Sequence, residues 1–85
     1  MTPARTDRAP LRLAVFEILQ RIAPEASPAA LDPARPLRDQ VDLGSMDWMN
    51  FLDALQERLG IDIPEADWAK LVTLDDLLAY LQARS

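Results

Sequence analysis

The chain has 85 residues and a formal net charge of −5, and it contains neither cysteine nor histidine. Without cysteine it has no disulfide framework and no thiol nucleophile of its own. Without histidine it lacks the usual general base and the commonest metal ligand. A chain of this length forms one domain, which buries roughly 60–65% of the surface that the unfolded chain exposes.

The acidic charge is concentrated in the second part of the chain. Residues 1–36 carry five arginines and four acids, whereas residues 37–85 carry ten acids and four bases. Nucleic-acid binding needs a basic surface, so this pattern argues against such a partner and favours partner proteins with basic docking surfaces. The apolar runs are too short to span a membrane, and the N-terminus lacks the apolar block of a signal peptide. We expect a cytoplasmic monomer without membrane insertion.

The first predicted element is a helix over residues 10–23. Residues 1–9 are small, charged or proline and show no periodicity, which predicts a disordered lead-in to a single domain over residues 10–85. Pro10 suits the first helical position. The apolar stripe of this helix is Leu11, Val15, Ile18, Leu19 and Ile22. Phe16 lies beside the stripe, where we expect it to cover the edge of the core.

Residues 24–44 form a connection that is long for a small domain and rich in proline. Proline fixes φ and so lowers the entropy that is lost when a loop becomes ordered. Four apolar side chains are expected to attach the loop to the helices: Leu31, Leu37, Val41 and Leu43. A loop of this length usually has a function.

A second helix is predicted over residues 45–59. Ser45 can cap its start through a hydrogen bond to an unpaired N–H of the first turn, and Gly60 can adopt the left-handed conformation that follows a helix. Its core face carries Trp48, Phe51, Leu52, Leu55 and Leu59. The other side, next to the serine, carries Met46, Met49, Asp53 and Glu57. Methionines and acids beside a hydroxyl indicate a recognition surface.

Two further helices are predicted after the extended connector Ile61-Asp62-Ile63-Pro64, whose isoleucines point inward. A short one covers residues 65–71, with Trp68 and Leu71 inward. The last covers residues 74–83 and is capped by Thr73 together with Asp76. Its core stripe is Leu74, Leu77, Leu78 and Leu81. The prediction is an all-α four-helix bundle with a long first loop and a short third helix.

The sequence offers no catalytic machinery. Ser45 has no histidine to activate it, and a serine hydroxyl without a base is a poor nucleophile. The two glycines, Gly44 and Gly60, cannot form a phosphate-binding loop, and no group of carboxylates has the spacing of a metal site. We therefore do not expect an enzyme. An enzyme that uses a bound metal is a weaker alternative, which metal analysis would test.

Residues 42–60 resemble the second helix and preceding loop of acyl carrier proteins. The hallmark of that family is Asp-Ser-Leu at the start of a long helix, and Gly44-Ser45-Met46 stands in its place here. The similarity continues through Ala54-Leu55, Gly60-Ile61-Asp62-Ile63-Pro64 and Leu71-Val72-Thr73-Leu74. It covers about residues 11–81, and the distance from the serine to Gly-Ile-x-Ile-Pro makes it specific.

The resemblance implies that Ser45 carries 4′-phosphopantetheine, with Gly44 flanking it. A phosphopantetheinyl transferase would attach this arm from coenzyme A with Mg²⁺, and a phosphodiester suits the start of a helix. The thiol of the arm would carry acyl groups as thioesters between enzymes of fatty-acid, lipid or secondary-metabolite biosynthesis. Partner recognition would fall to Met46, Asp47, Met49, Asp53 and Glu57. The acyl pocket would be lined by Leu52, Leu55, Ile63, Trp68, Leu71 and Leu77.

Three departures from the family pattern qualify this function. Gly44 replaces an aspartate that helps the transferase recognise its site. Positions that are commonly acidic hold Asn50, Gln56 and Arg58, which indicates specialised partners. Trp68 replaces a small residue near the acyl pocket, which predicts short, polar or exposed cargo. Two alternatives stay open: an aminoacyl or peptidyl carrier, and an unmodified adaptor that binds partner proteins.

Overall fold

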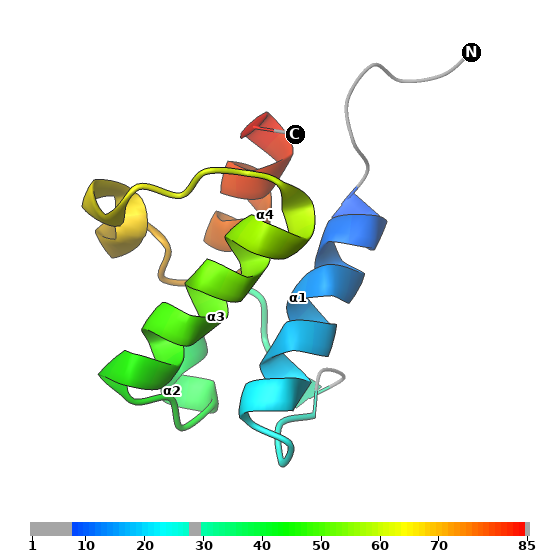
Figure 1. Ribbon diagram of the computed structural model, residues 1–85. Helices are drawn as coiled ribbons and strands as arrows, with labels where there is room; N and C mark the ends of the chain where they lie inside the picture. The colour runs from blue at the N-terminus through cyan, green and yellow to red at the C-terminus, as the bar shows by residue number, and fades with distance from the viewer. Residues whose placement is uncertain (1–7, 28–29, 85) are drawn as a thin grey trace.

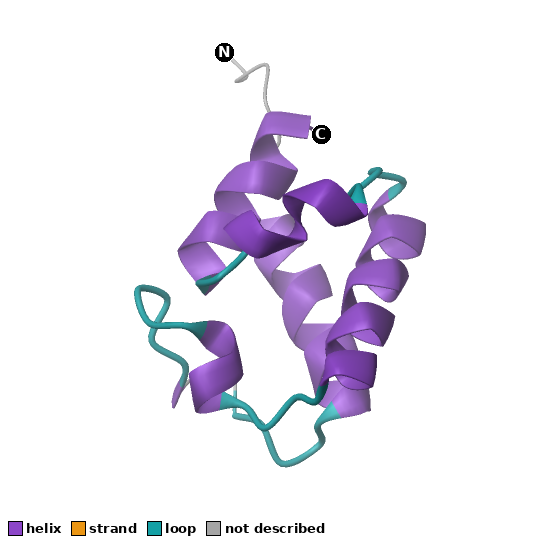
Figure 2. Ribbon diagram, turned by 90° about the vertical axis from the view of Figure 1, so that its left-hand side faces the viewer, coloured by secondary structure: helices purple, strands orange, loops and turns teal. Residues whose placement is uncertain are grey.

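The computed structural model describes residues 8–27 and 30–84. In these ranges the elements are α1 (Arg8–Ile22), α2 (Leu37–Gln40), α3 (Ser45–Leu59), the 3₁₀ helix η2 (Glu65–Lys70) and α4 (Leu74–Arg84). Figure 2 shows helices and loops, and no strand, in this part of the chain. The predicted all-α fold is confirmed, and α2 is an addition to the four predicted helices.

The first helix begins two residues earlier than predicted, so Arg8 and Ala9 do not belong to a disordered lead-in; residues 1–7 of that prediction lie outside the described part. Pro10 is accommodated because the N–H groups of the first helical turn have no helical acceptor. The side chain of Arg8 holds this turn against α4. Its Nε donates to Oε1 of Gln82 at 3.1 Å, and its Nη1 lies 3.7 Å from Oδ1 of Asp75.

The long loop between α1 and α3 is attached to the start of α4. The N–H of Leu37 donates to the carbonyl oxygen of Val72 at 2.8 Å, and the N–H of Asp75 donates to that of Pro33 at 3.1 Å. The four predicted apolar anchors all pack in or against the core: Leu31, Leu37, Val41 and Leu43. The loop also contains α2, a single turn that is too short to give a hydrophobic period in the sequence.

Glycine residues flank α3 at both ends, which corrects the prediction that Ser45 is the N-cap. Gly44 has the extended conformation of an N-cap, and its carbonyl oxygen accepts the first helical hydrogen bond, from the N–H of Trp48 at 2.9 Å. Ser45 is already the first helical residue, and the N-cap position makes no side-chain capping hydrogen bond. At the other end Gly60 adopts a φ of 66°, as predicted, and its N–H donates to the carbonyl oxygen of Gln56.

The connector after α3 places both isoleucines inward, as predicted. Ile61 and Ile63 are buried, and Pro64 precedes η2. The predicted short helix is a 3₁₀ helix that ends at Lys70, one residue before the predicted end. Leu71 follows it and is buried.

The capping of the last helix is as the sequence predicts. The N–H of Asp76 donates to Oγ1 of Thr73 at 3.0 Å, and the N–H of Thr73 donates to Oδ2 of Asp76 at 3.1 Å. This reciprocal pair satisfies two backbone donors at the start of the helix. The helix extends one residue beyond the prediction, to Arg84.

The core lies between α1, α3 and α4, with α1 packed against both of the others (Figure 1). The largest fully buried side chains on these helices are Val15, Leu19, Phe51, Leu52, Leu55, Leu77, Leu78 and Leu81. Burial of each such side chain contributes roughly 1.5–3 kcal/mol. Phe16 packs against the edge of this core, as predicted. Among the described residues, no helix combines the length and apolarity required to cross a membrane.

Candidate functional site

Ser45 lies exposed at the first position of α3. The N–H groups of the first helical turn are not used within the helix, so the positive end of the helix dipole faces the same region as the hydroxyl. Gly44 leaves this region open, because a Cβ at that position would meet no heavy atom within 4 Å. The local geometry therefore presents an accessible hydroxyl where an attached anion would be stabilised.

Arg38 on α2 reaches the same junction between loop and helix. Its Nη2 donates to the carbonyl oxygen of Leu43 at 3.4 Å, and its guanidinium carbon lies 5.7 Å from the centre of the Trp48 ring. Trp48 is buried and stacks on Phe51, with ring centres 5.3 Å apart. Sequence reasoning did not single out Arg38, because its contacts depend on α2.

The residues predicted for partner recognition follow Ser45 along the outer side of α3. Met46 is 67% exposed, Asp47, Asp53 and Glu57 are exposed, and Met49 is half-buried. Towards the far end of the helix, Asp53 and Glu57 line a surface pocket together with Asp62 of the connector. The exposed side of α3 thus presents one large apolar side chain and several acids.

The residues predicted to line an acyl pocket all belong to the core or its edge. Leu52, Leu55, Ile63, Leu71 and Leu77 are buried in one hydrophobic cluster. Trp68 is partly buried and packs against that cluster from η2. These side chains therefore form a continuous apolar interior behind α3.

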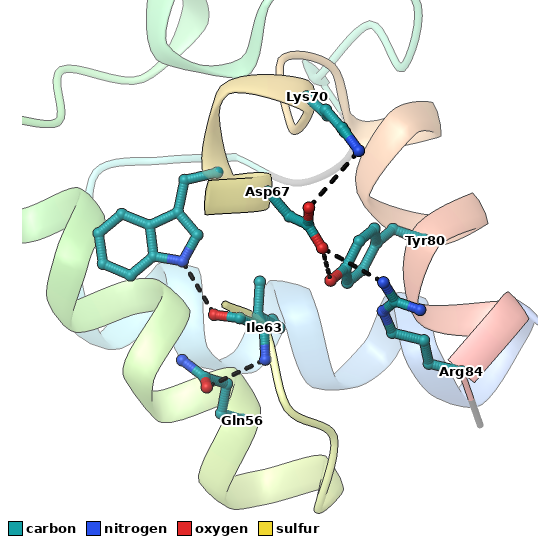
Figure 3. A network of polar contacts seen from close by, with 7 residues as sticks. Gln56, Ile63, Asp67, Lys70, Tyr80 and Arg84 are labelled. Atoms are coloured by element: carbon teal, nitrogen blue, oxygen red, sulfur yellow. Dashed lines mark hydrogen bonds and ion pairs between the residues drawn. The ribbon is translucent and has the colours of Figure 1, made fainter. Parts of the chain in front are cut away.

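A group of polar contacts, which we call the η2 clasp, joins η2 to α4 through Asp67, Lys70, Tyr80 and Arg84 (Figure 3). The hydroxyl of Tyr80 donates to Oδ2 of Asp67 at 2.6 Å, and Nη2 of Arg84 lies 3.2 Å from the same oxygen. Nζ of Lys70 lies 3.5 Å from Oδ1 of Asp67. The guanidinium of Arg84 also covers the Tyr80 ring at 4.1 Å.

The clasp changes the acidity of its members. The hydrogen bond from Tyr80 lowers the pKa of Asp67; partial burial opposes this shift, and Arg84 and Lys70 add to it. Burial raises the pKa of Tyr80, and its hydrogen bond to the Asp67 carboxylate raises it further. Asp67 is therefore held ionised and Tyr80 protonated, the states that their mutual hydrogen bond needs.

Two further hydrogen bonds fix the connector between α3 and η2, as Figure 3 shows. The N–H of Ile63 donates to Oε1 of Gln56 at 3.0 Å, and the indole Nε1 of Trp68 donates to the carbonyl oxygen of Ile63 at 3.1 Å. Together with the clasp, these bonds link α3, η2 and α4 in series. Sequence reasoning missed them, because they depend on how the elements meet in space.

Residues 14–81 match the family described as the phosphopantetheine attachment site. The chain belongs to this family. Its members are carriers rather than catalysts, and they hold 4′-phosphopantetheine covalently. The resemblance to acyl carrier proteins is thereby confirmed over most of the chain.

Curated relatives of this carrier include acyl carrier proteins of two kinds. The meromycolate extension acyl carrier protein of Mycobacterium tuberculosis is 26% identical over 68 residues, covering 80% of this chain and 58% of the relative. That of Mycolicibacterium smegmatis is 27% identical over 66 residues, covering 78% and 66%. The acyl carrier protein of Campylobacter hominis is 27% identical over 71 residues, covering 80% and 90%. The carrier thus spans little more than half the length of the Mycobacterium tuberculosis relative.

The surroundings of Ser45 fit the phosphodiester of such an arm. The hydroxyl is exposed, and the first turn of α3 supplies unpaired N–H donors. The adjacent Gly44 adds no carboxylate, and Arg38 supplies a cation at the same junction. An anion at this place meets the positive end of the helix and the cation of Arg38, while Asp47 of the same turn adds one negative charge.

Proposed function

We propose that this carrier holds 4′-phosphopantetheine on Ser45 and carries acyl groups in a dedicated lipid or secondary-metabolite pathway of the cytoplasm. The observation that carries the proposal is the exposed Ser45 hydroxyl at the open start of α3. When attached, the arm supplies a terminal thiol on which an acyl group is held as a thioester. The protein presents this cargo and docks with the enzymes that load and unload it.

Attachment needs an external enzyme. The described residues hold no cluster of acids that could bind a metal ion, and the chain has no histidine to accept the proton of Ser45. A phosphopantetheinyl transferase supplies both functions. The Oγ–P bond forms as the pyrophosphate bond of coenzyme A breaks, and the hydroxyl proton and the adenosine bisphosphate half leave.

The outer side of α3 supports docking by partners with basic surfaces. Met46 is an adaptable apolar contact beside the attachment residue, and Asp47, Asp53 and Glu57 provide exposed negative charge. Complementary charge accelerates encounter and selects orientation. Met49 is half-buried and contributes only part of its side chain to this surface.

A specialised pathway is supported by the structural use of residues that replace common acids on α3. Gln56 accepts the hydrogen bond from Ile63, and Arg58 forms an ion pair with Glu17 of α1. Neither side chain is therefore a simple substitute for a docking carboxylate. Relatives named meromycolate extension acyl carrier proteins favour lipid assembly as the setting.

Short, polar or exposed cargo is supported by the immobilisation of η2. A long acyl chain that entered the core beside η2 would have to displace Trp68 from its hydrogen bond with Ile63 and strain the η2 clasp. The side chains of Leu52, Leu55 and Leu77 are almost completely buried in the apolar interior. Displacing packed side chains costs free energy, so cargo outside the core is favoured.

The test of the proposal is intact mass after incubation with coenzyme A, Mg²⁺ and a broad-specificity phosphopantetheinyl transferase. We expect the mass to increase by one phosphopantetheine in the wild type and in Ser27→Ala, an exposed serine elsewhere, and not in Ser45→Ala. Labelling of Ser45→Ala would contradict the assignment.

Gly44 favours a second candidate function, an unmodified adaptor, because it replaces the aspartate that the transferase recognises. If the wild type stays unlabelled, Gly44→Asp separates the two functions. Labelling of that variant would indicate a carrier with a weakened recognition site, and its failure would favour the adaptor. An aminoacyl or peptidyl carrier shares the arm and is distinguished by which activated acids its partner enzymes load.

A further inference from the structure

Arg38 contacts residues that precede and follow Ser45 in the chain. It donates a hydrogen bond to the carbonyl oxygen of Leu43, two residues before Ser45, and its guanidinium covers the ring of Trp48, three residues after it. Positions three apart on a helix are neighbours, so the buried Trp48 and the exposed Ser45 lie next to each other on the first turn of α3. The guanidinium is thereby positioned beside the start of α3.

Arg38 forms no ion pair with a carboxylate within the part of the chain that the structure describes. The ion pairs there involve Arg8, Arg58, Lys70 and Arg84. Its one hydrogen bond goes to a neutral carbonyl oxygen, although a guanidinium has five N–H donors. Gly44 places no acid between Arg38 and the serine. A formal positive charge with spare donors therefore lies at this junction.

We propose that Arg38 is a positioning residue that contacts the phosphodiester of an arm attached to Ser45. The inference rests on the proposed attachment. A phosphodiester has one negative charge shared by two oxygens, and the planar guanidinium matches that geometry with two parallel N–H donors. The first turn of α3 donates from one side and Arg38 from the other.

This contact gives the arm a direction. A phosphodiester held by Arg38 leaves Ser45 on the α2 and Trp48 side of the helix, rather than across the acids farther along α3. The negative charges of Asp53 and Glu57 stay available for partner docking. The unpredicted helix α2 then has a function, because it carries Arg38, whose guanidinium contacts Leu43 before the serine and Trp48 after it.

The experiment compares the unmodified and phosphopantetheinylated forms of the whole chain for wild type, Arg38→Gln and Arg38→Lys. Arg35→Gln is the matched control, because Arg35 is an exposed arginine of the same loop. Intact mass verifies modification of each variant. The readouts are the ³¹P chemical shift of the phosphodiester and the change in unfolding temperature on modification, measured at low and high salt.

We expect modification to raise the unfolding temperature of the wild type, by an amount that decreases in high salt because the contact is exposed and screened. Arg38→Gln should lose at least half of this increase and change the ³¹P shift, Arg38→Lys should retain part of it, and Arg35→Gln should match the wild type. Subtracting the unmodified form removes any purely structural effect of losing the contacts to Leu43 and Trp48.

Two failures are distinguishable. If modified Arg38→Gln shows the ³¹P shift and the temperature increase of the wild type, Arg38 does not contact the phosphodiester, while attachment at Ser45 stands. If neither the wild type nor Gly44→Asp accepts the arm, the proposed attachment is wrong and the inference is overturned with it.

Discussion

Tyr80 on α4 donates its hydroxyl hydrogen to the carboxylate of Asp67 on η2, with 2.6 Å between the two oxygens. This bond joins the last helix to a short 3₁₀ element that has no fully buried residue of its own. Because η2 has little apolar anchorage, its position depends on these polar contacts and on the partly buried Trp68.

The η2 clasp predicts a specific dependence of stability on pH. The folded-state pKa of Asp67 is lowered from 3.8 chiefly by the Tyr80 hydrogen bond, so its stabilisation is present above pH 3.8 and is lost as the pH falls through the lowered value. The folded-state pKa of Tyr80 is raised from 10.0 chiefly by burial. Its interaction with Asp67 is therefore present below pH 10 and is lost as the pH rises through the raised value.

Urea unfolding of wild type, Tyr80→Phe and Asp67→Asn across this range measures the effect. Both variants should have a lower urea midpoint at neutral pH. The wild-type advantage over Asp67→Asn should disappear in acid, and its advantage over Tyr80→Phe should disappear in strong alkali. Difference curves that stay flat with pH would show that the clasp does not stabilise the fold.

Cargo length should have little effect on the stability of the wild type. The modified chain loaded with a long saturated acyl group should unfold at nearly the same temperature as with acetyl, because we expect η2 to keep the long chain outside the core. Trp68→Ala should bring a gain of several degrees with the long chain, since the removed side chain leaves apolar space for it. An equal gain in the wild type would contradict the prediction of exposed cargo.

Gly44→Asp should stabilise the chain and accelerate modification. The backbone of Gly44 is extended with φ of −71°, and a Cβ there meets no heavy atom within 4 Å. Aspartate is a better N-cap than glycine by a few tenths of a kcal/mol, and its charge favours the helix dipole. Chemical denaturation and the initial rate of labelling measure the two effects, with Gly44→Ala as the variant that gains a side chain without a cap.

Gly60→Ala should cost about 1 kcal/mol of unfolding free energy, because alanine is strained in the left-handed conformation. Gly60 has φ of 66°, and open space around it removes steric clash as a cause. Gly60→Asn should cost less, since asparagine tolerates this region better. Equal losses for the two variants in urea denaturation would contradict a backbone origin.

The sequence predicted the parts of this structure that have a local or periodic cause. The stripe of α3, the turn at Gly60 and the capping by Thr73 each depend on residues within a few positions of one another. The contacts between Glu17 and Arg58, and between Asp67 and Tyr80, join residues of different elements. Hydrophobic periodicity in the sequence does not predict such contacts. α2 was missed because a single turn gives no hydrophobic period, and Arg38 was missed because its contacts depend on α2.

The helical cap was misassigned by one position, although Ser45 was placed correctly at the start of α3. A serine before an apolar stripe is a common N-cap signal, but the extended backbone lies at Gly44. The consequence is favourable for the candidate site, because a hydroxyl that is not engaged in capping is available for modification. The choice of Ser45 as the attachment residue remains a prediction.

Two backbone hydrogen bonds attach the loop before Ser45 to the start of the last helix: one from Leu37 to Val72 and one from Asp75 to Pro33. Any event that unwinds the beginning of α4, such as proteolytic cleavage or mechanical tension, breaks the attachment of the loop that contains α2. The amide protons of Leu37 and Asp75, which donate these two hydrogen bonds, should therefore exchange with solvent at similar rates. The structure of the loop that leads to Ser45 is thereby coupled to that of the first turn of α4.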